Sequence, residues 1–156
     1  MLVYRASRRH RAAFDPLDSS ASVARDGWRF NDKRSEILYT AEVQSLSILE
    51  VAARPGWDTV TELTIAAIEV PDGTVFDLSD LGIVRPAAPN AQSIGGEFLA
   101  AVDREAAAGR RVCGVRVPSV ISTTDHNVLL DPRQKASFSV ASWSRIPFNW
   151  LAGTAT

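Results

Sequence analysis

Short strand-like runs, broken at close intervals by proline, glycine and aspartate, restrict the fold of this chain more than any other feature. The run "TVTELTIAAIEV" alternates in part between apolar and polar residues, and Pro71-Asp72-Gly73 then turns the chain into a second run, "TVFDL". Similar runs predict strands at residues 2–5, 37–40, 111–117, 127–130 and 137–143. This pattern is typical of a strand-rich domain.

Two segments predict helices. The clearer one is "EFLAAVDREAAAG", in which Phe98, Val102 and Ala106 share a face and Gly109 stands where a C-terminal cap is expected. The other covers about residues 43–53. With no internal repeat and no linker, residues 1–156 are expected to form one compact α+β domain with a mixed central sheet and a few helices.

Composition excludes several classes of function. A formal charge of −1 gives the chain no field that would attract nucleic acid or a membrane surface. The basic cluster Arg5, Arg8, Arg9, His10 and Arg11 is therefore interpreted as a solvated face. No apolar run of signal-peptide or membrane-spanning length occurs, so a cytoplasmic location is expected.

Metal and nucleoside-triphosphate chemistry lack sequence support. Two histidines and one cysteine, far apart, cannot form a zinc site by spacing, and no Walker-type loop is present. The single cysteine, Cys113, lies in the strand-like run "RRVCGVRV", where a packed thiol is expected. We therefore expect no metal.

Glu50 is the single charged residue between Val43 and Ala53, in a segment that is otherwise largely apolar. On a helical wheel Leu46, Leu49 and Ala53 cluster on one side, with Glu50 beside them. A helix that is apolar nearly all round is usually buried, so Glu50 is expected to be partly enclosed and to need a partner. A surface glutamate on an amphipathic helix is the alternative.

Candidate partners of Glu50 lie upstream of it. Arg29 stands between Trp28 and Phe30, and stacking on aromatic rings suits an arginine to two-pronged binding of carboxylate or phosphate. Tyr39, on the strand before the helix, offers a flat ring and a hydroxyl. Spacing alone leaves both a structural Arg29–Glu50 ion pair and a catalytic site open.

Six motifs follow one another in the order "VYR", "GWRFND", "ILYTAE", "SILE", "RVPSVI" and "HNVLLDP". Together they resemble the RES domain family over almost the whole chain. The resemblance implies a fold similar to that of ADP-ribosyltransferases and cleavage of the nicotinamide–ribose bond of NAD. It also implies that the protein is the toxin of a bacterial toxin–antitoxin pair.

The resemblance also implies the site residues. The family's arginine falls on Arg29, its glutamate on Glu50 and its serine on Ser119, while Tyr39 and Arg5 match its tyrosine and its first arginine. Glu50 would stabilise the ribosyl cation, and both arginines would hold the pyrophosphate. Tyr39 would stack on the nicotinamide or bond its ribose, and Ser119 would donate to a ribose or carboxamide oxygen.

The sequence departs from the family pattern in two places. Phe30 stands for the usual tryptophan, and Trp28 replaces a small residue, which keeps an aromatic wall. The segment from Asp131 to Gln134 lacks the family's histidine. His126 is expected to be a loop residue without a catalytic role.

Three functions remain open at this stage. The first is an NAD phosphorylase or glycohydrolase with phosphate or water as acceptor, and the second is an ADP-ribosyltransferase that modifies a protein. The third is a non-catalytic binding module with a structural Arg29–Glu50 pair. The resemblance further implies a helix-turn-helix (Xre-type) antitoxin as partner and is compatible with self-association, whereas direct binding to nucleic acid or membrane is not expected.

Overall fold

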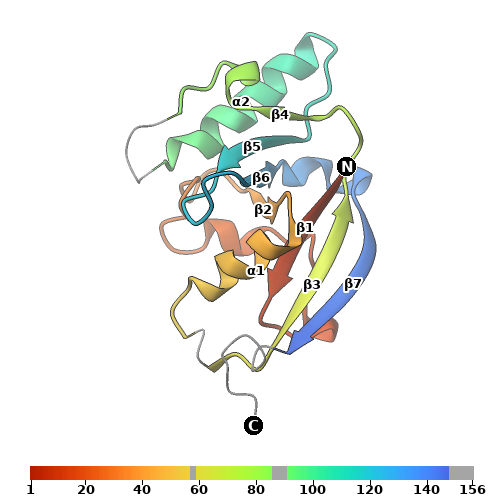
Figure 1. Cartoon of the computed structure of the whole chain (residues 1–156). Coiled ribbons are helices and arrows are strands. Elements are labelled where there is room, and N and C mark those ends of the chain that lie inside the picture. The colour runs from red at the N-terminus through yellow and green to blue at the C-terminus, as the bar shows by residue number, and fades with distance from the viewer. Residues whose placement is uncertain (57–58, 86–90, 148–156) are drawn as a thin grey trace.

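A computed structural model describes residues 1–56, 59–85 and 91–147. Its helices and strands, in chain order, are β1 (Leu2–Ser7), β2 (Leu38–Ala41), α1 (Gln44–Ala52), β3 (Glu62–Glu69), β4 (Val75–Asp77), α2 (Ser93–Ala107), β5 (Gly114–Pro118), β6 (His126–Leu130) and β7 (Ser139–Pro147). Short 3-10 helices are η1 (Arg11–Ala13), η2 (Ser20–Val23), η4 (Ser79–Leu81) and η5 (Pro132–Ser137). The predicted α+β class with a mixed sheet is confirmed (Figure 1).

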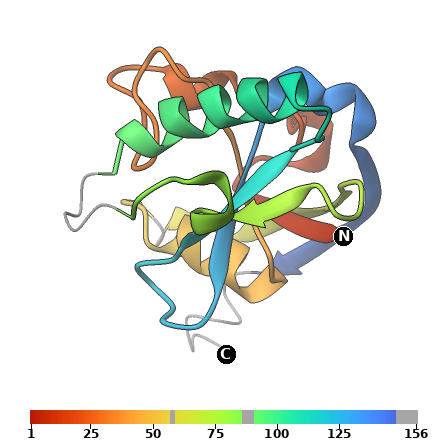
Figure 2. The same cartoon turned by 90° about the horizontal axis from the view of Figure 1, so that it is seen from above.

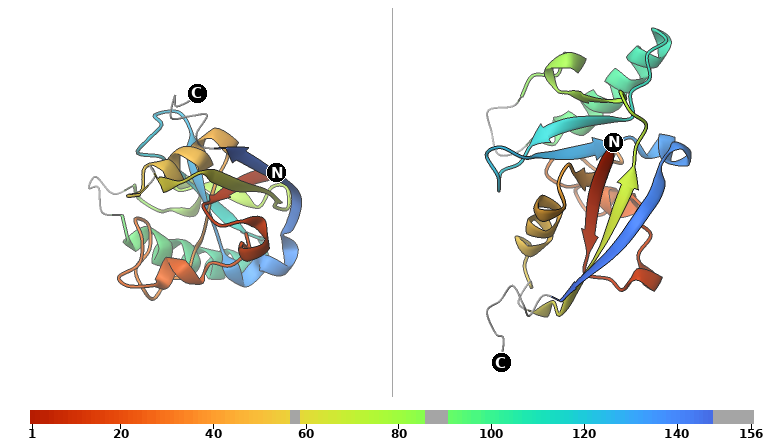
Figure 3. Two further views of the ribbon diagram at one scale, coloured as in Figure 1. Left: turned by 90° about the horizontal axis from the view of Figure 1, so that it is seen from below. Right: turned by 45° about the vertical axis from the view of Figure 1, so that its right-hand side comes forward.

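The seven strands form one sheet in the order β4-β5-β6-β2-β1-β3-β7, in which β4 and β5 are parallel and the other neighbours antiparallel. One pair, Tyr4↔Ala41, joins β1 to β2, whereas β1 pairs with β3 along its whole length. The sheet is therefore nearly divided between β2 and β1. Figure 3 shows the consequence, because β5 and β6 cross the molecule at a steep angle to β1, β3 and β7.

Each half of the sheet carries one helix on the same side. α2 lies across the half formed by β4, β5 and β6, and α1 packs against β1, β2 and β3 (Figures 1 and 2). Phe98 of α2 packs with Val115 and Leu129, and all three are fully buried. Val51 of α1 packs with Leu63 of β3.

The opposite face of the sheet is covered mainly by irregular segments. Buried side chains of the strands, among them Val3, Ile68 and Leu130, form one cluster there with Phe138. Phe14, from the segment after β1, packs against the same cluster. The core is thus two-sided, and α1, which contacts both β1 and β2, lies over the junction between the two halves of the sheet.

α2 begins at Ser93, four residues before the predicted start at 97. The sequence did not predict this first turn, because it contains Gly95 and Gly96 and glycine is a poor helix former. Gly95 is needed there because its backbone N–H donates to the Phe30 carbonyl at 2.6 Å, and a Cβ on Gly95 would lie 2.8 Å from the Cβ of Asn31. The start of α2 is thereby attached to the loop that precedes β2.

α2 ends at Ala107, and Gly109, which has a φ of +79°, lies in the C-terminal cap as predicted. The N–H groups of Gly109 and Arg110 donate to the carbonyls of Ala106 and Glu105, which is a Schellman cap.

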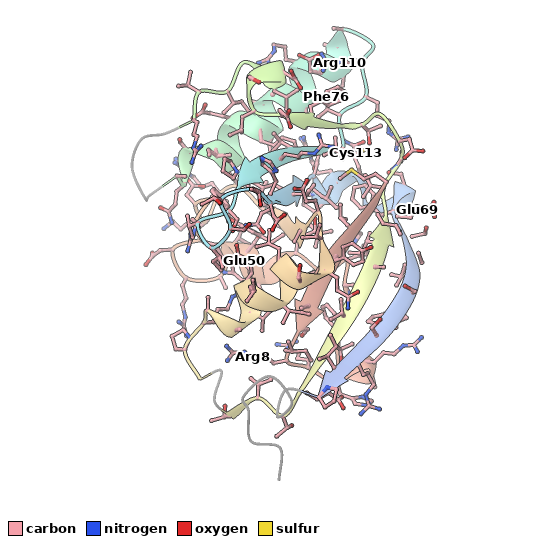
Figure 4. The ribbon with its side chains drawn as sticks, in the orientation of Figure 1. Arg8, Glu50, Glu69, Phe76, Arg110 and Cys113 are labelled. Atoms are coloured by element: carbon pink, nitrogen blue, oxygen red, sulfur yellow. The ribbon has the colours of Figure 1, made fainter. Side chains whose placement is uncertain are left out.

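The predicted strands are present with shifted ends. β5 begins at Gly114 rather than 111, because the chain before it bonds to Thr74. β7 continues to Pro147 rather than ending at 143, because it stays paired with β3 as far as Glu62. Cys113 is fully buried with its Sγ 3.2 Å from Gln134 Oε1, so the packed thiol is confirmed (Figure 4).

Candidate active site

α1 buries a different face from the one predicted. Leu46, Ser47 and Val51 are buried, whereas Leu49 is 47% exposed and Ala53 is exposed as well. The expectation of a helix apolar and buried nearly all round is therefore wrong, because α1 covers one side of the sheet and faces solvent on the other. Glu50 stands at the rim of the buried face and is half-buried, as expected.

Two side chains hold the same oxygen of the Glu50 carboxylate. Asn127 of β6 donates from Nδ2 to Oε1 at 2.7 Å, and Ser119, just after β5, donates from Oγ to Oε1 at 3.3 Å. The Ser119 oxygen itself accepts from the backbone N–H groups of Ile121 and Ser122, so its own proton is directed at Glu50. Within the described residues no donor bonds Oε2. The carboxylate is thus anchored at one oxygen and open at the other. Figure 4 shows the position of Glu50 on α1.

The Tyr39 hydroxyl is fully engaged with the preceding loop. It donates to Asn31 Oδ1 at 2.6 Å and accepts from the Phe30 backbone N–H at 3.1 Å. Burial raises the pKa of Tyr39 above its usual range, so the phenol stays protonated. The Tyr39 ring lies 5.0 Å from that of Trp28 and 6.3 Å from that of Phe30. Of the two predicted roles, this geometry favours stacking.

Arg29 lies at the tip of the turn formed by residues 28–31. The turn is closed by the Trp28 N–H, which donates to the Asn31 carbonyl at 2.9 Å. Its corner position leaves Arg29 exposed, yet its charge is close enough to act on the Tyr39 hydroxyl. An Arg29–Glu50 ion pair was one of the two alternatives that the sequence left open, and among the described residues no such pair forms.

Arg54, which the sequence prediction did not include, is the cation beside Glu50. Its guanidinium lies 4.4 Å from the centre of the Trp28 ring and so loses water on one side, although the residue as a whole is exposed. That loss of hydration lowers the pKa of Arg54, and the Glu50 charge opposes the shift. Tyr39 is also close to Arg54, because the positive charge of Arg54 partly opposes the rise in the pKa of the Tyr39 hydroxyl.

Arg5 is partly used by the fold. Its Nη1 donates to the carbonyls of Pro16 and Asp18 at 2.8 and 2.7 Å, and the guanidinium lies 5.6 Å from the Phe14 ring. Burial lowers the pKa of Arg5, and the Arg54 charge contributes in the same direction. Arg5 therefore borders the site, but its guanidinium also anchors the segment after β1.

Three residues of this arrangement were missed, namely Asn31, Arg54 and Asn127. Arg54 follows Glu50 by four residues, a spacing that places both side chains on one helical face and could have revealed it. Asn127 lies in the motif "HNVLLDP", but its bond to Glu50 spans 77 residues and has no local signal. Asn31 is fully buried, and its pairing with Tyr39 depends on the turn.

Two further expectations concern the end of the chain. His126 begins β6 rather than lying in a loop, and its Nδ1 is 3.0 Å from Glu42 Oε1. The segment that departs from the family pattern is used structurally here. Asp131 caps η5 and pairs with Arg133, while Gln134 donates to the backbone before β5.

The described residues contain no group of three or more histidine, cysteine, aspartate or glutamate side chains that could hold a metal ion. Among them, no helix has both the length and the apolar character needed to cross a bilayer.

The site combines an anchored carboxylate, an aromatic wall and two arginines, Arg29 and Arg54, whose side chains make no ion pair among the described residues. A carboxylate with one open oxygen can stabilise a developing positive charge. Aromatic rings and guanidinium groups bind planar and anionic parts of a ligand. The arrangement suits cation-forming chemistry on a ligand that is itself partly anionic.

The fold is similar to that in the crystal structure of the M. tuberculosis MbcT–MbcA toxin–antitoxin complex. The TM-score is 0.64 at 15% sequence identity, over 94% of this chain and 84% of that chain. No curated protein matches the sequence significantly. The family model described as "RES domain" matches residues 2–150, which is nearly the whole sequence. The chain therefore belongs to the RES domain family.

Proposed function

We propose that this protein is the toxin of a toxin–antitoxin pair and that it depletes NAD by cleaving the nicotinamide–ribose bond, with phosphate or water as acceptor. Membership of the RES domain family supports the toxin role, and the similarity to a toxin in complex with its antitoxin agrees with it. The observation that carries the chemistry is the Glu50 carboxylate, anchored at Oε1 by Asn127 and Ser119 and free of protein donors at Oε2 among the described residues.

The reaction needs a negative charge at one place. When the bond between the ribose C1″ and the nicotinamide nitrogen breaks, its electron pair stays on the nitrogen and neutralises the pyridinium ring. Positive charge then builds on the ribose carbon, and a nearby carboxylate lowers the energy of that transition state. The acceptor oxygen of phosphate or water bonds to C1″, and the proton it carried is released to solvent. Glu50 would supply the charge through Oε2.

The other site residues would bind and orient the dinucleotide. The ring of Tyr39, with Trp28 beside it, would stack on the nicotinamide, because the Tyr39 hydroxyl is already used by Asn31 and Phe30. Arg29, exposed at the turn, and Arg5 would face the phosphates. Ser119 would act through Glu50 rather than on the ribose, since its proton is directed at the carboxylate.

A protein that consumes NAD must be held inactive until it is needed. A helix-turn-helix (Xre-type) antitoxin that covers the site would meet that need. The exposed apolar side chains nearest the site in sequence, Leu49 beside Glu50 and Val120 with Ile121 after Ser119, would suit such a cover.

Product analysis tests the proposal. Purified protein is incubated with NAD in phosphate buffer and in a phosphate-free buffer, and the products are identified by mass spectrometry. We expect free nicotinamide in one or both buffers, with ADP-ribose or its 1″-phosphate as co-product. Glu97→Gln, a change at an exposed α2 glutamate, is the matched control for Glu50→Gln. If the folded parent protein leaves NAD intact in both buffers, the proposed reaction is wrong; ADP-ribose found on a protein would assign a different acceptor.

A further inference from the structure

The arginine after α1 is held in an unusual way for a surface residue. Arg54 comes one residue after Ala53, the C-cap of α1, and its guanidinium carbon lies over Trp28 at 4.4 Å from the ring centre. A cation–π contact of this kind restricts the guanidinium and leaves its N–H groups available to other acceptors. No carboxylate or carbonyl of the described chain accepts from them.

The backbone of Arg54 is fixed as well. Its N–H donates to the Val51 carbonyl at 3.2 Å, and its carbonyl accepts from Arg8 Nη2 at 3.1 Å. Arg8 also donates to the carbonyls of Val51 and Pro55, at 3.0 and 2.9 Å. The guanidinium of Arg8 therefore compensates the partial negative charge at the C-terminal end of α1. The guanidinium of Arg54 is not needed for that interaction.

Three arginines, Arg5, Arg29 and Arg54, are candidates for binding the phosphates, and they differ in which of their N–H groups are already bonded. Arg5 already bonds two backbone carbonyls, and Arg29 stands at an exposed corner without a stacking contact among the described residues. Arg54 is the one that is both oriented by an aromatic ring and free of acceptors. An arginine in this state is prepared for two parallel bonds to phosphate, because little rotamer freedom is left to lose.

We infer that Arg54 binds the pyrophosphate of the dinucleotide, with Trp28 as the surface that orients its guanidinium. The inference rests on the proposed function, since it assigns a further substrate-binding residue to the same site. It places the phosphates just beyond the C-terminal end of α1, near Glu50, and adds Arg54 to Arg29 and Arg5, the two arginines proposed above to face them. The planar guanidinium predicts that lysine will not fully replace it.

Calorimetric binding of ADP-ribose tests this inference without any need for turnover. The parent is compared with Arg54→Gln, Arg54→Lys and Arg34→Gln; Arg34 is a matched control, 84% exposed and paired with Asp32. We expect Arg54→Gln to weaken binding about 10- to 150-fold, the range for a lost charge-assisted hydrogen bond. Arg54→Lys should lie between Arg54→Gln and the parent, and Arg34→Gln should stay within about twofold of the parent. Added salt should weaken binding to the parent more than to Arg54→Gln.

Two results would contradict the assignment of Arg54. If Arg54→Gln binds ADP-ribose as tightly as the parent, the stacking on Trp28 is packing alone and the inference is wrong. The same holds if the parent does not bind ADP-ribose. Thermal melting checks that the variants are folded, and Arg54→Lys decides the question if Arg54→Gln does not fold. NAD turnover by the parent is measured separately, so failure of the proposed reaction is distinguished from failure of this assignment.

Discussion

Replacing Asn127 by aspartate probes the anchor of Glu50 with almost no change in shape. In the parent, Nδ2 of Asn127 donates to Glu50 Oε1 at 2.7 Å, and Asn127 is 7% exposed. Aspartate puts an oxygen where that donor was, so two carboxylates face each other at hydrogen-bonding distance. Like charges this close cannot both stay ionised cheaply, and the pair is expected to share a proton.

The expected fall in kcat follows from the hydrogen bond and the charge that each variant loses at Glu50. Asn127→Ala removes one hydrogen bond to a charged group, worth about 1.5–3 kcal/mol, so kcat should fall about 10- to 150-fold. In Asn127→Asp the shared proton leaves one negative charge divided between the two carboxylates, so Glu50 loses much of the charge that opposes the ribosyl cation, and the rate should approach the loss of about 10²–10³ expected when that charge is absent. The expected order of kcat is therefore parent, then Asn127→Ala, then Asn127→Asp.

The assay is nicotinamide release at saturating NAD, followed as a function of pH. Because like charges oppose ionisation of both carboxyls, kcat of Asn127→Asp should climb relative to the parent as the pH is raised and the shared proton is lost. Thr124→Ala, at an exposed position near the start of β6, is the control, and melting curves confirm folding. A kcat for Asn127→Asp equal to that of the parent at neutral pH, or a pH profile identical to the parent's, would refute the reasoning.

Three further predictions concern the frame around the site. Tyr39→Phe should lower the stability by about 1–3 kcal/mol, because the Asn31 and Phe30 bonds to its hydroxyl are lost. Since the pKa of Tyr39 is raised in the folded state, the parent should also lose stability as the pH rises above about 10, and Tyr39→Phe should lack this component in urea titrations. Gly95→Ala should lower the melting temperature, because its Cβ would lie 2.8 Å from the Phe30 carbonyl oxygen. In the control Gly96→Ala, the new Cβ would lie 3.4 Å from its nearest neighbour, and the melting temperature should stay equal or rise. A lower melting temperature for Gly96→Ala than for Gly95→Ala would contradict the packing described here. Arg8→Gln should destabilise α1 by about 1 kcal/mol through its lost bonds to backbone carbonyls, whereas the exposed Arg9→Gln should not, as measured by chemical denaturation.

Local patterns in the sequence predict most of the elements. Alternation and turn residues locate the strands, and Gly109 predicts the end of α2, because both signals act between near neighbours in the chain. The start of α2 is missed, because Gly95 is there for contact with Phe30 and Asn31, which lie far away in sequence. The face of α1 is missed for a similar reason, since Leu49 faces solvent although it is apolar.

Some residues of the candidate site were predicted from the sequence, and others depend on contacts between distant segments. The resemblance to the RES domain family selected Glu50 and Ser119, and the fold brings them to 3.3 Å of each other. It does not indicate which groups hold the carboxylate, because the bond from Asn127 depends on how β6 is placed against α1. Arg54 and Arg29 carry the same charge, so only their positions in the fold show that the Arg54 guanidinium lies over Trp28 while Arg29 stands at an exposed corner.

The central claim is that the Glu50 carboxylate stabilises positive charge on the ribose of bound NAD. The most direct measurement is the single-turnover rate of nicotinamide release by Glu50→Gln at saturating NAD, compared with the parent and with Glu97→Gln. The account predicts a rate about 10²–10³ lower for Glu50→Gln, with Glu97→Gln unchanged. A folded Glu50→Gln protein that releases nicotinamide at the parent's rate would contradict it.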